Sequence, residues 1–465
     1  MKKIIRISLI LAVLLLMSSP ALAQDDQPQN PTYIVQTGDT LWNIARKLHV
    51  SYDQLLSQNG LDADSSILPG RELRVPGLTG VSGELTTRRI QFGESLTSLS
   101  RMYQIPEDKL ARLNRLTTPQ ELYAGVSVVL MKPEGGEVVQ PKRAALAAGE
   151  SPLELAAQEG VNPWALVVEN QQSSRWNLVP GEVLYVPGTS SDGPGALPAE
   201  ISKVSYSPDT FVQGNTMVIQ LHAPQDTELQ GVLGDYPLHF FNNGETSYVA
   251  LQGLHAREDL GLKPLSLSGT LPDGTPFAHL QMVRVLSGNY PFEDILNVPT
   301  ETVGLDRTEE EAIRLETLAS EVTSNRIWRG QFVSPVQPEY SECWWSFFGN
   351  RRSFNGSGYL YFHSGLDFCS NLGDSIFAAA PGSVVFTGDL PIHGGTTMID
   401  HGWGVYTLYS HQSEILIREG ESVSPGDLIG RIGSTGRSSG PHLHWEVWVG
   451  GVQVDPLDWL QNPYP

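Results

Sequence analysis

His442-Leu443-His444-Trp445-Glu446 and His363-Ser364-Gly365-Leu366-Asp367, both near the C-terminus, are the stretches around which the rest of the chain can be understood. In the first stretch, a spacing of two puts both imidazoles on the same face of an extended strand. In the second, a spacing of four on a straight strand would hold histidine and aspartate roughly 13 Å apart. The chain must therefore bend between them, and Gly365 permits that bend.

The residue types in these stretches are candidates for the ligands of a catalytic zinc site. Two imidazoles and one carboxylate, with a fourth position open to water, are a catalytic ligand set. The candidate ligands of one Zn²⁺ per chain are His363, Asp367 and His444, which leaves His411 and His442 for proton transfer and for stabilising an oxyanion. Six of the eleven histidines fall within residues 363–465, which supports one site over the alternative of unrelated core or surface histidines.

The order of these motifs resembles that of the lysostaphin-like (LytM-type) zinc endopeptidases. The neighbouring segments agree: Ala380-Pro381-Gly382, Ile399-Asp400-His401-Gly402, Leu408-Tyr409-Ser410-His411 and Gly433-Ser434-Thr435-Gly436. The resemblance covers roughly residues 327–461. It implies a mainly antiparallel β catalytic domain at 327–465 that hydrolyses peptide bonds in peptidoglycan.

The first 23 residues have the pattern of a secretory signal peptide. Basic residues precede an apolar run, Leu9–Met17, and Ala21-Leu22-Ala23 offers a cleavage site. We expect a mature protein that begins at Gln24 and is secreted to the cell wall or periplasm. No later stretch approaches the roughly 20 apolar residues of a membrane-spanning helix.

The charge of the chain limits its partners. Thirty Lys and Arg against 51 Asp and Glu give a net charge of -21. Nucleic acid and anionic lipid select for basic patches, so neither is an expected partner.

Residues 32–187 contain an internal repeat in three copies. Aligning Gly38, Gly93 and Gly149 places a second glycine 32 residues later in each copy and an asparagine 21 residues later. Fixed offsets of this kind indicate a repeated structural unit.

Each copy is predicted to be a βααβ unit. Thr40 caps the first helix in copy one, and the second helices begin at Ser51, Pro106 and Asn162, which are residue types favoured at helix N-termini. The asparagine then suits a left-handed helix C-cap. The three units, at 32–76, 87–133 and 142–187, resemble LysM modules, which implies binding to the N-acetylglucosamine-containing glycan of peptidoglycan.

The resemblance places the glycan between two loops of each module. In the first two modules these loops comprise Gly38, Asp39, Thr40, Leu41, Ile67, Leu68, Pro69 and Gly70, and then Gly93, Glu94, Ser95, Leu96, Leu122, Tyr123, Ala124 and Gly125. The third module has 149–152 and 178–181 as equivalents. The third module has Pro152 where the other two have Leu41 and Leu96. The alternative for this module is therefore a spacer that binds no ligand.

The middle of the chain is predicted to contain a linker, a spacer domain and a helix that connect the repeats to the catalytic domain. Residues 188–199 are a linker rich in Ser, Gly and Pro, and residues 200–290 alternate in short apolar and polar runs, which favours an immunoglobulin-like β-sandwich spacer. A helix is expected within residues 305–326, with Asp306 and Glu309 as a capping box. Its apolar stripe, Ala312, Leu315, Ala319 and Val322, is expected to dock on the catalytic domain.

Cys343 and Cys369 are the only cysteines, and they flank two of the candidate zinc ligands. In an exported protein they suggest a disulfide worth about 3.5 kcal/mol. The alternatives are two free thiols or two zinc ligands.

Three functions compete for this architecture. The first is a zinc endopeptidase that cleaves the stem peptides of peptidoglycan, the second a non-catalytic activator of a cell-wall amidase, and the third a wall-binding adhesin. A complete ligand set favours the enzyme. The sequence leaves open whether the bond cut is a D-Ala to diaminopimelate link or a glycine bridge.

Overall fold

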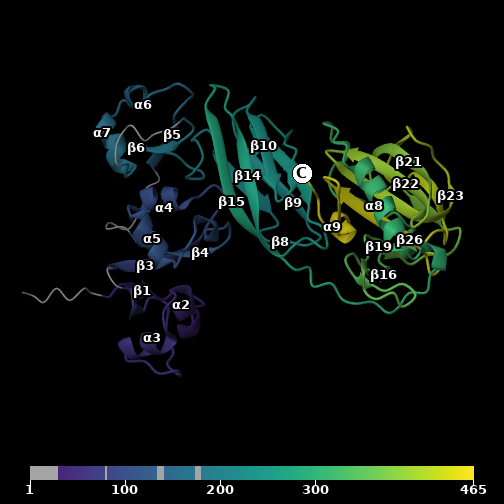
Figure 1. The fold of residues 1–465 in the computed structure, drawn as a ribbon, viewed down its shortest axis with the longest axis horizontal. Coiled ribbons are helices and arrows are strands. Elements are labelled where there is room, and N and C mark those ends of the chain that lie inside the picture. The colour runs from purple at the N-terminus through teal and green to yellow at the C-terminus, as the bar shows by residue number, and fades with distance from the viewer. Residues whose placement is uncertain (1–29, 79–80, 133–140, 173–179) are drawn as a thin grey trace, which may run out of the picture. The chain divides into compact units, whose positions relative to one another are not determined.

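The computed structural model describes residues 30–78, 81–132, 141–172 and 180–465 (Figure 1). The predicted signal peptide, its cleavage site and Leu178 of the third repeat lie outside the described residues. Within those ranges, no helix combines the length and apolar character needed to cross a membrane. The contacts divide the chain into two compact units, 1–88 with 129–136, and 89–128 with 137–465.

The three repeats share one order of elements. The first contains β1 (Thr32–Ile34), α2 (Leu41–Lys47), α3 (Tyr52–Gln58) and β2 (Glu72–Arg74). The second contains β3 (Glu84–Arg89), α4 (Leu96–Tyr103), α5 (Glu107–Leu113), the 3-10 turn η1 (Pro119–Glu121) and β4 (Ser127–Met131). The third contains β5 (Pro141–Ala145), α6 (Pro152–Gln158), α7 (Pro163–Glu169) and β6 (Val183–Ser190). The predicted starts of the second helices are confirmed, since Ser51, Pro106 and Asn162 are their N-cap residues.

The asparagine after each second helix does not have the predicted conformation. Asn59, Asn114 and Asn170 have φ of -106°, -97° and -92°, outside the left-handed region. In the first and third repeats the side chain instead joins the helix end to the closing strand. Asn170 Nδ2 donates to the carbonyl of Tyr185 at 2.8 Å, and the amide of Tyr185 donates back to Asn170 Oδ1 at 2.7 Å. Asn59 makes the same reciprocal pair with Arg74.

Residues 203–286 form two antiparallel sheets that share one apolar core. One sheet has the order β12-β13-β9-β7 and the other β11-β10-β14-β15-β8, in which only the short β8–β15 pairing is parallel. The strands are β7 (Lys203–Ser207), β8 (Phe211–Val212), β9 (Thr216–His222), β10 (Glu228–Leu233), β11 (Tyr236–Leu238), β12 (Phe241–Asn242), β13 (Ser247–Gly253), β14 (Gly261–Thr270) and β15 (Pro276–Leu286). Met217 and Leu221 of β9 lie in one cluster with Leu265 and Leu267 of β14.

The C-terminal domain is built on a ten-stranded sheet, and every pairing in it is antiparallel. Its main path runs β16-β19-β26-β23-β22-β21-β24. The strands are β16 (Trp344–Ser346), β19 (Leu366–Phe368), β20 (Ser375–Phe377), β21 (Gly382–Leu390), β22 (Gly394–Gly402), β23 (Val405–Ile415), β24 (Ser422–Val423), β25 (Leu428–Ile432), β26 (Leu443–Val449) and β27 (Val452–Val454). A small hairpin of β17 (Arg351–Arg352) and β18 (Tyr361–Phe362), 3-10 turns η3 (Thr300–Thr302) and η4 (Pro338–Tyr340), and helix α9 (Pro456–Gln461) complete this part of the chain. The β-rich C-terminal domain that the resemblance implied is confirmed.

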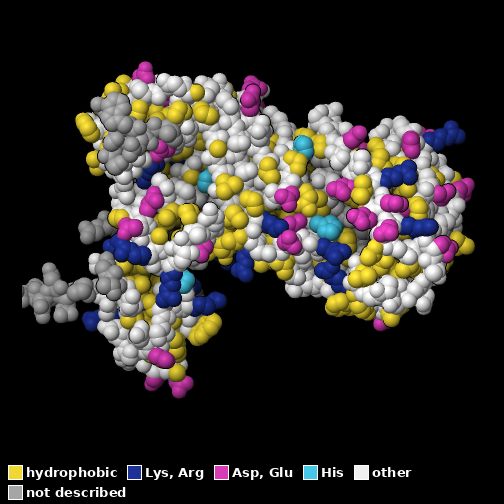
Figure 2. Space-filling model, in the orientation of Figure 1, with side chains coloured by type: hydrophobic (Ala, Val, Ile, Leu, Met, Phe, Trp, Pro, Cys, Tyr) yellow, Lys and Arg dark blue, Asp and Glu magenta, His cyan; other side chains and the backbone are white. Residues whose placement is uncertain are grey.

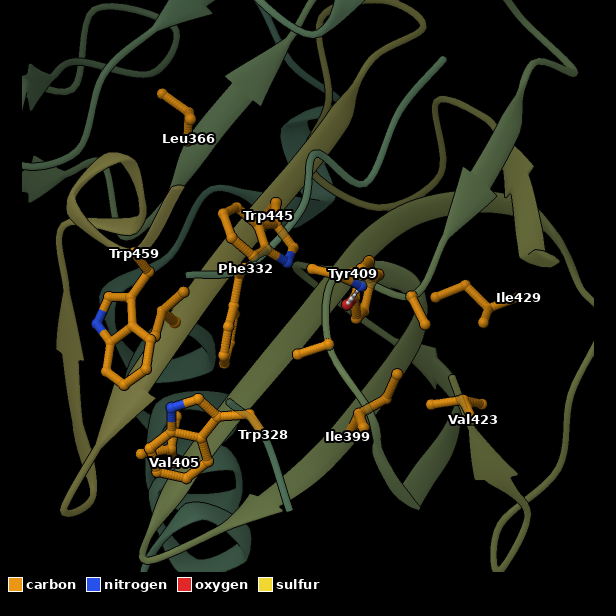
Figure 3. Packing of buried hydrophobic residues seen from close by; sticks show 14 of the residues in the cluster. Trp328, Phe332, Leu366, Ile399, Val405, Tyr409, Val423, Ile429, Trp445 and Trp459 are labelled. Carbon is orange, nitrogen blue, oxygen red and sulfur yellow. Dashed lines mark hydrogen bonds between the residues drawn. The ribbon is translucent and has the colours of Figure 1, made fainter. Parts of the chain in front are cut away.

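Both faces of this sheet are covered, which explains why β22 and β26 are buried along their whole length. On one face Trp328, Phe332, Trp445 and Trp459 pack together around the central strands (Figure 3). On the other face helix α8 (Leu305–Ala319) lies across the sheet (Figure 1). A strand buried on both faces has little freedom, so the side chains that it carries are held firmly.

Helix α8 differs from its predicted form. The predicted capping box of Asp306 and Glu309 is wrong, because the helix begins at Leu305 after Gly304 and has no side-chain cap. The helix also ends at Ala319, before the predicted last member of the apolar stripe, Val322.

The buried face of α8 is only partly apolar. Leu315 and Ala319 pack against Tyr406 and Trp448 of the sheet, as the stripe predicted. Between them and the helix start, however, the buried residue is Glu311, which is 5% exposed. A buried carboxylate requires partners, and these partners lie in the site described next.

Candidate active site

Strand pairing brings the two motifs together. Asp367 of β19 lies directly opposite His444 of β26 in the antiparallel register, and such cross-strand partners have adjacent side chains. His363 precedes β19 in a segment that is not a strand, so the predicted bend is present. His363 Nε2, Asp367 Oδ1 and His444 Nδ1 lie 2.9 Å from one another in each of the three pairs. All three predicted ligands are buried.

Gly365 is required for a reason different from the predicted one. Its backbone is not in the left-handed region that favours glycine. A Cβ at this position would instead lie 2.3 Å from the carbonyl oxygen of Trp445 and 2.9 Å from Cε1 of His444. Glycine is therefore needed for the close approach of β26.

The outer hydrogen bonds determine which nitrogen of each ligand faces the centre. His363 Nδ1 lies 2.8 Å from the carbonyl of Phe347, which can only accept, so Nδ1 carries the proton and Nε2 has a lone pair. His444 Nε2 lies 2.9 Å from Glu446 Oε1, so His444 Nδ1 likewise has a lone pair. Three lone pairs, including that of Asp367, thus converge at 2.9 Å, an arrangement that is repulsive unless a cation sits among them. This donor set fits zinc.

His411 and His442 line the same centre with matching tautomers. Nδ1 of His411 donates to the carbonyl of Thr435 at 2.7 Å, and Nδ1 of His442 donates to the carbonyl of Gly440 at 2.8 Å. The Nε2 atom of His411 is therefore an acceptor. Nε2 of His442 lies 3.5 Å from Asp367 Oδ1; burial acts to lower the pKa of His442, but the Asp367 carboxylate outweighs it and raises that pKa. The two rings are 4.8 Å apart. His411 has a φ of 59°, a strained conformation of the kind that is common at functional sites.

Burial and charge keep the ligand and base groups in useful protonation states. Burial, aided by the charge of Arg352, lowers the pKa of His363 to about 4. Burial also acts to raise the pKa of Asp367, but the charges of His363 and Arg352 outweigh it and hold that pKa well below its usual range. Burial, with His442 and His444 nearby, holds the pKa of His411 well below its usual range as well. Near neutral pH, both imidazoles are neutral and the carboxylate is ionised.

A cavity of about 390 Å³ opens beside this centre. His363, His411 and His444 form part of its wall, and Ala312 and Leu315 of α8 form another part. The cavity gives a substrate space to approach the converging groups.

Several residues around the site were not predicted from the sequence. They are Arg352, which donates to Asp367 Oδ2 at 2.6 Å, together with Glu446, His393 and Glu311. Glu446 carried a local signal, because a residue two positions after His444 lies on the same face of β26. His393 and Glu311 carried none, since they are 82 residues apart in the chain.

The predicted glycan-binding loops of the first module are open. Thr40, Leu68 and Gly70 are exposed, and Leu68 has 74% of its surface accessible. Asp39 has a structural role, since it accepts from Tyr33 Oη at 2.8 Å and pairs with Lys47. The remaining predicted residues of this module lie around it, with only Leu41 buried.

The equivalent loops of the second module are covered by the chain itself. The amide of Gly93 donates to Gln281 of β15 at 2.9 Å, and the amide of Ala124 donates to the carbonyl of Met282 at 2.9 Å. A Cβ at Gly93 would lie 2.4 Å from Pro194. Buried in consequence are Gly93, Glu94, Leu122 and Ala124, whereas Gly125 stays exposed. In this structure β15 lies against the loops that are predicted to bind glycan, and glycan binding by the second module stays a prediction.

Cys343 and Cys369 are joined by a disulfide, with their Cα atoms 5.4 Å apart. The described residues contain no free cysteine. The bridge lies beside the pairing of β16 with β19, where the amide of Cys369 donates to the carbonyl of Cys343 at 3.0 Å. It therefore restrains the strand that carries Asp367.

Comparisons with known proteins agree with this geometry. Residues 361–456 match Peptidase family M23. The M23 match contains all five residues of the centre, His363, Asp367, His411, His442 and His444. Residues 33–76 and 89–130 each match the LysM domain, so two of the three predicted modules are matched.

Several relatives that are similar to part of this chain are named as peptidases. The DD-carboxypeptidase/endopeptidase Mpg of Neisseria meningitidis is 43% identical over 95 residues, which are 20% of this chain and 22% of that protein. The peptidoglycan DD-endopeptidase ShyA of Vibrio cholerae is 41% identical over 95 residues, with the same shares. The match thus spans less than a quarter of these relatives.

Among solved structures, the catalytic domain of lysostaphin from Staphylococcus simulans has 30% identity and a TM-score of 0.21. That alignment covers 23% of this chain and 82% of the lysostaphin domain. A TM-score this low is not evidence of a shared overall fold.

Proposed function

We propose that this protein is a secreted, zinc-dependent endopeptidase that cleaves peptide cross-links of peptidoglycan. The observation that carries the proposal is the convergence of three lone pairs, from His363, Asp367 and His444, at 2.9 Å. These residues would hold one Zn²⁺. When bound, zinc supplies a Lewis acid that polarises a peptide carbonyl and acidifies water.

The remaining histidines would move the protons. The Nδ1 atoms of His411 and His442 are engaged by backbone carbonyls, which leaves Nε2 of either residue to exchange a proton with the attacking water. The protonated imidazole can then donate to the leaving amine or stabilise the oxyanion.

The N-terminal modules would hold the enzyme on its substrate. The exposed loops of the first module favour it as a site for N-acetylglucosamine-containing glycan, whereas β15 covers the second. We extend the LysM assignment to residues 142–187, because the third repeat has the same strand and helix order. The two-sheet domain at 200–290 would be an immunoglobulin-like spacer.

The names of the relatives favour a D,D-peptide bond within the stem peptides as the bond that is cut. The alternatives are an amidase activator and an adhesin, neither of which requires a convergent ligand set. Digesting purified sacculi and identifying the products by mass tests the proposal. Zinc-dependent release of monomers from cross-linked stem-peptide dimers is expected, with His444→Ala as the inactive control. Intact cross-links after digestion with the zinc-loaded protein would refute it.

A further inference from the structure

We infer that two carboxylates in the segment joining the two-sheet domain to the catalytic domain, Glu293 and Glu311, are positioning residues for the metal centre. Glu311 is linked to His444 through two intermediate side chains. Glu293 is linked to Asp367 and to His363 through one intermediate side chain each. The inference rests on the proposed metal site and assigns the connecting segment a part in it. A simple spacer would need no such contacts.

The first path runs from α8 to His444. Glu311 Oε1 is hydrogen-bonded to His393 Nδ1, and the backbone amides of Ile392 and His393 donate to the Glu311 carboxylate at 2.7 and 2.9 Å. His393 Nε2 lies 3.1 Å from Glu446 Oε1, and the same oxygen lies 2.9 Å from His444 Nε2. The path therefore ends on His444 Nε2, whose proton leaves the lone pair on Nδ1, the nitrogen that faces the metal centre.

The second path runs from the segment before η3 to Asp367 and His363. Glu293 Oε2 accepts from Arg352 Nε at 2.8 Å, and Arg352 Nη2 donates to Asp367 Oδ2 at 2.6 Å. Glu293 Oε1 also bonds Ser346 Oγ, which lies 2.9 Å from His363 Nδ1. Glu293 thus contacts residues that hold both of these ligands.

Charge explains why these contacts affect metal binding. Arg352 is shared between two carboxylates, so Glu293 reduces the pull of the guanidinium on Asp367, which must present its other oxygen to the metal. On the other path, His393 lies between Glu311 and Glu446 and balances their charge. The side chains of Glu311 and Glu446 are 3% and 0% exposed, so water does not replace a lost partner. Partners of this kind typically change metal affinity 10- to 100-fold.

A second metal ion could also use part of this cluster, because ligand atoms of His393, His444 and Glu446 lie within 4.8 Å of one another. The hydrogen bonds argue against it. Here each imidazole nitrogen that faces Glu446 has a carboxylate oxygen as acceptor, so no lone pairs oppose each other. The cluster is complete without an ion, and we expect a stoichiometry of one.

The test compares isosteric variants of the full mature chain. Glu311→Gln and Glu293→Gln remove one charge each and keep the side-chain size. Glu310→Gln and Asp294→Asn are matched controls, since they remove one charge from exposed neighbours. Zinc affinity is measured by competition with a chromophoric chelator, and the visible absorption of the Co²⁺-loaded proteins reports the ligand geometry.

We expect each test variant to bind zinc about 10- to 100-fold more weakly, with a changed Co²⁺ spectrum, and each control to match the wild type. Wild-type affinity and spectrum in either folded test variant would overturn the inference, as would two zinc ions per wild-type chain. If Glu311→Gln fails to fold, His393→Gln tests the same path. A wild type that binds no zinc would instead refute the metal site itself, so the two failures are distinguishable.

Discussion

The buried His401 should make the stability of the catalytic domain depend on pH in a defined window. His401 is fully buried at the end of β22, and its Nδ1 donates to the carbonyl of Pro381 at 2.8 Å. Burial lowers its pKa from 6.5 to about 4. The unfolded chain therefore binds a proton more readily than the fold. The resulting stability is present above pH 6.5 and is lost as the pH falls toward 4.

The difference between the two pKa values of His401 gives the magnitude of this effect. The difference between 6.5 and about 4 corresponds to about 3.4 kcal/mol in full. Between pH 7.5 and pH 4.5, linkage predicts a loss of about 2.5 kcal/mol from His401 alone. The variant His401→Asn lacks this group, so it should lose about 2.5 kcal/mol less than the wild type over the same range.

Hydrogen exchange of peptides from β22 and β23, measured on chelator-treated protein, reports the unfolding free energy of this domain separately from the others. Other buried histidines contribute to both proteins, so the difference isolates His401. The exposed His239, changed to Asn, serves as a control and should follow the wild type. Equal losses in the wild type and His401→Asn would refute the reasoning.

Four further outcomes are expected. Asp367→Ala should lose bound zinc, and near-stoichiometric metal in that variant would exclude the assignment. His411→Ala and His442→Ala should retain zinc yet lower turnover roughly 10²- to 10⁴-fold, and wild-type turnover in either would contradict their proposed role. Removing residues 24–78 should abolish most retention on insoluble peptidoglycan while a small soluble peptide is still cleaved, because the groove of the second module is covered; unchanged retention would count against this. Replacing Cys343 and Cys369 by Ser should cost about 3.5 kcal/mol, measured as the shift in unfolding free energy under oxidising conditions; an unshifted value would remove the disulfide from the stability argument.

The parts of the site that were predictable from sequence are those encoded locally. His363 and Asp367 are four residues apart, and His442 and His444 are two apart, so a spacing argument places them. The supporting contacts join residues that are far apart in the chain. His393 and Glu311 are separated by 82 positions, and Arg352 and Glu293 by 59. No periodicity connects such positions, so only the folded chain reveals them.

In the repeats, too, the locally encoded features were predictable from the sequence and the long-range contacts were not. Their helix starts follow from capping preferences, which depend on a few neighbouring residues. The role of Asn170 depends on Tyr185, its hydrogen-bond partner in the closing strand. An asparagine suits both a left-handed helix cap and this pair of hydrogen bonds, so the residue type alone does not distinguish them. Likewise the offsets of the second module predict its fold but carry no information on β15, which covers its groove. On the face drawn in Figure 2, acidic and basic side chains are interspersed.

The outer acceptors of the four histidines at the centre differ in one respect that matters for control of the site. His363, His411 and His442 each donate to a backbone carbonyl, which does not titrate and which any residue type provides. His444 alone donates to a carboxylate, Glu446. Its orientation therefore depends on the charge around that carboxylate, which also accepts from Trp448, Gln453, Ser364 and His393. Of these donors only His393 is tied to another part of the chain by a second carboxylate. Helix α8 is thus linked to the one histidine ligand whose outer hydrogen-bond acceptor is a carboxylate.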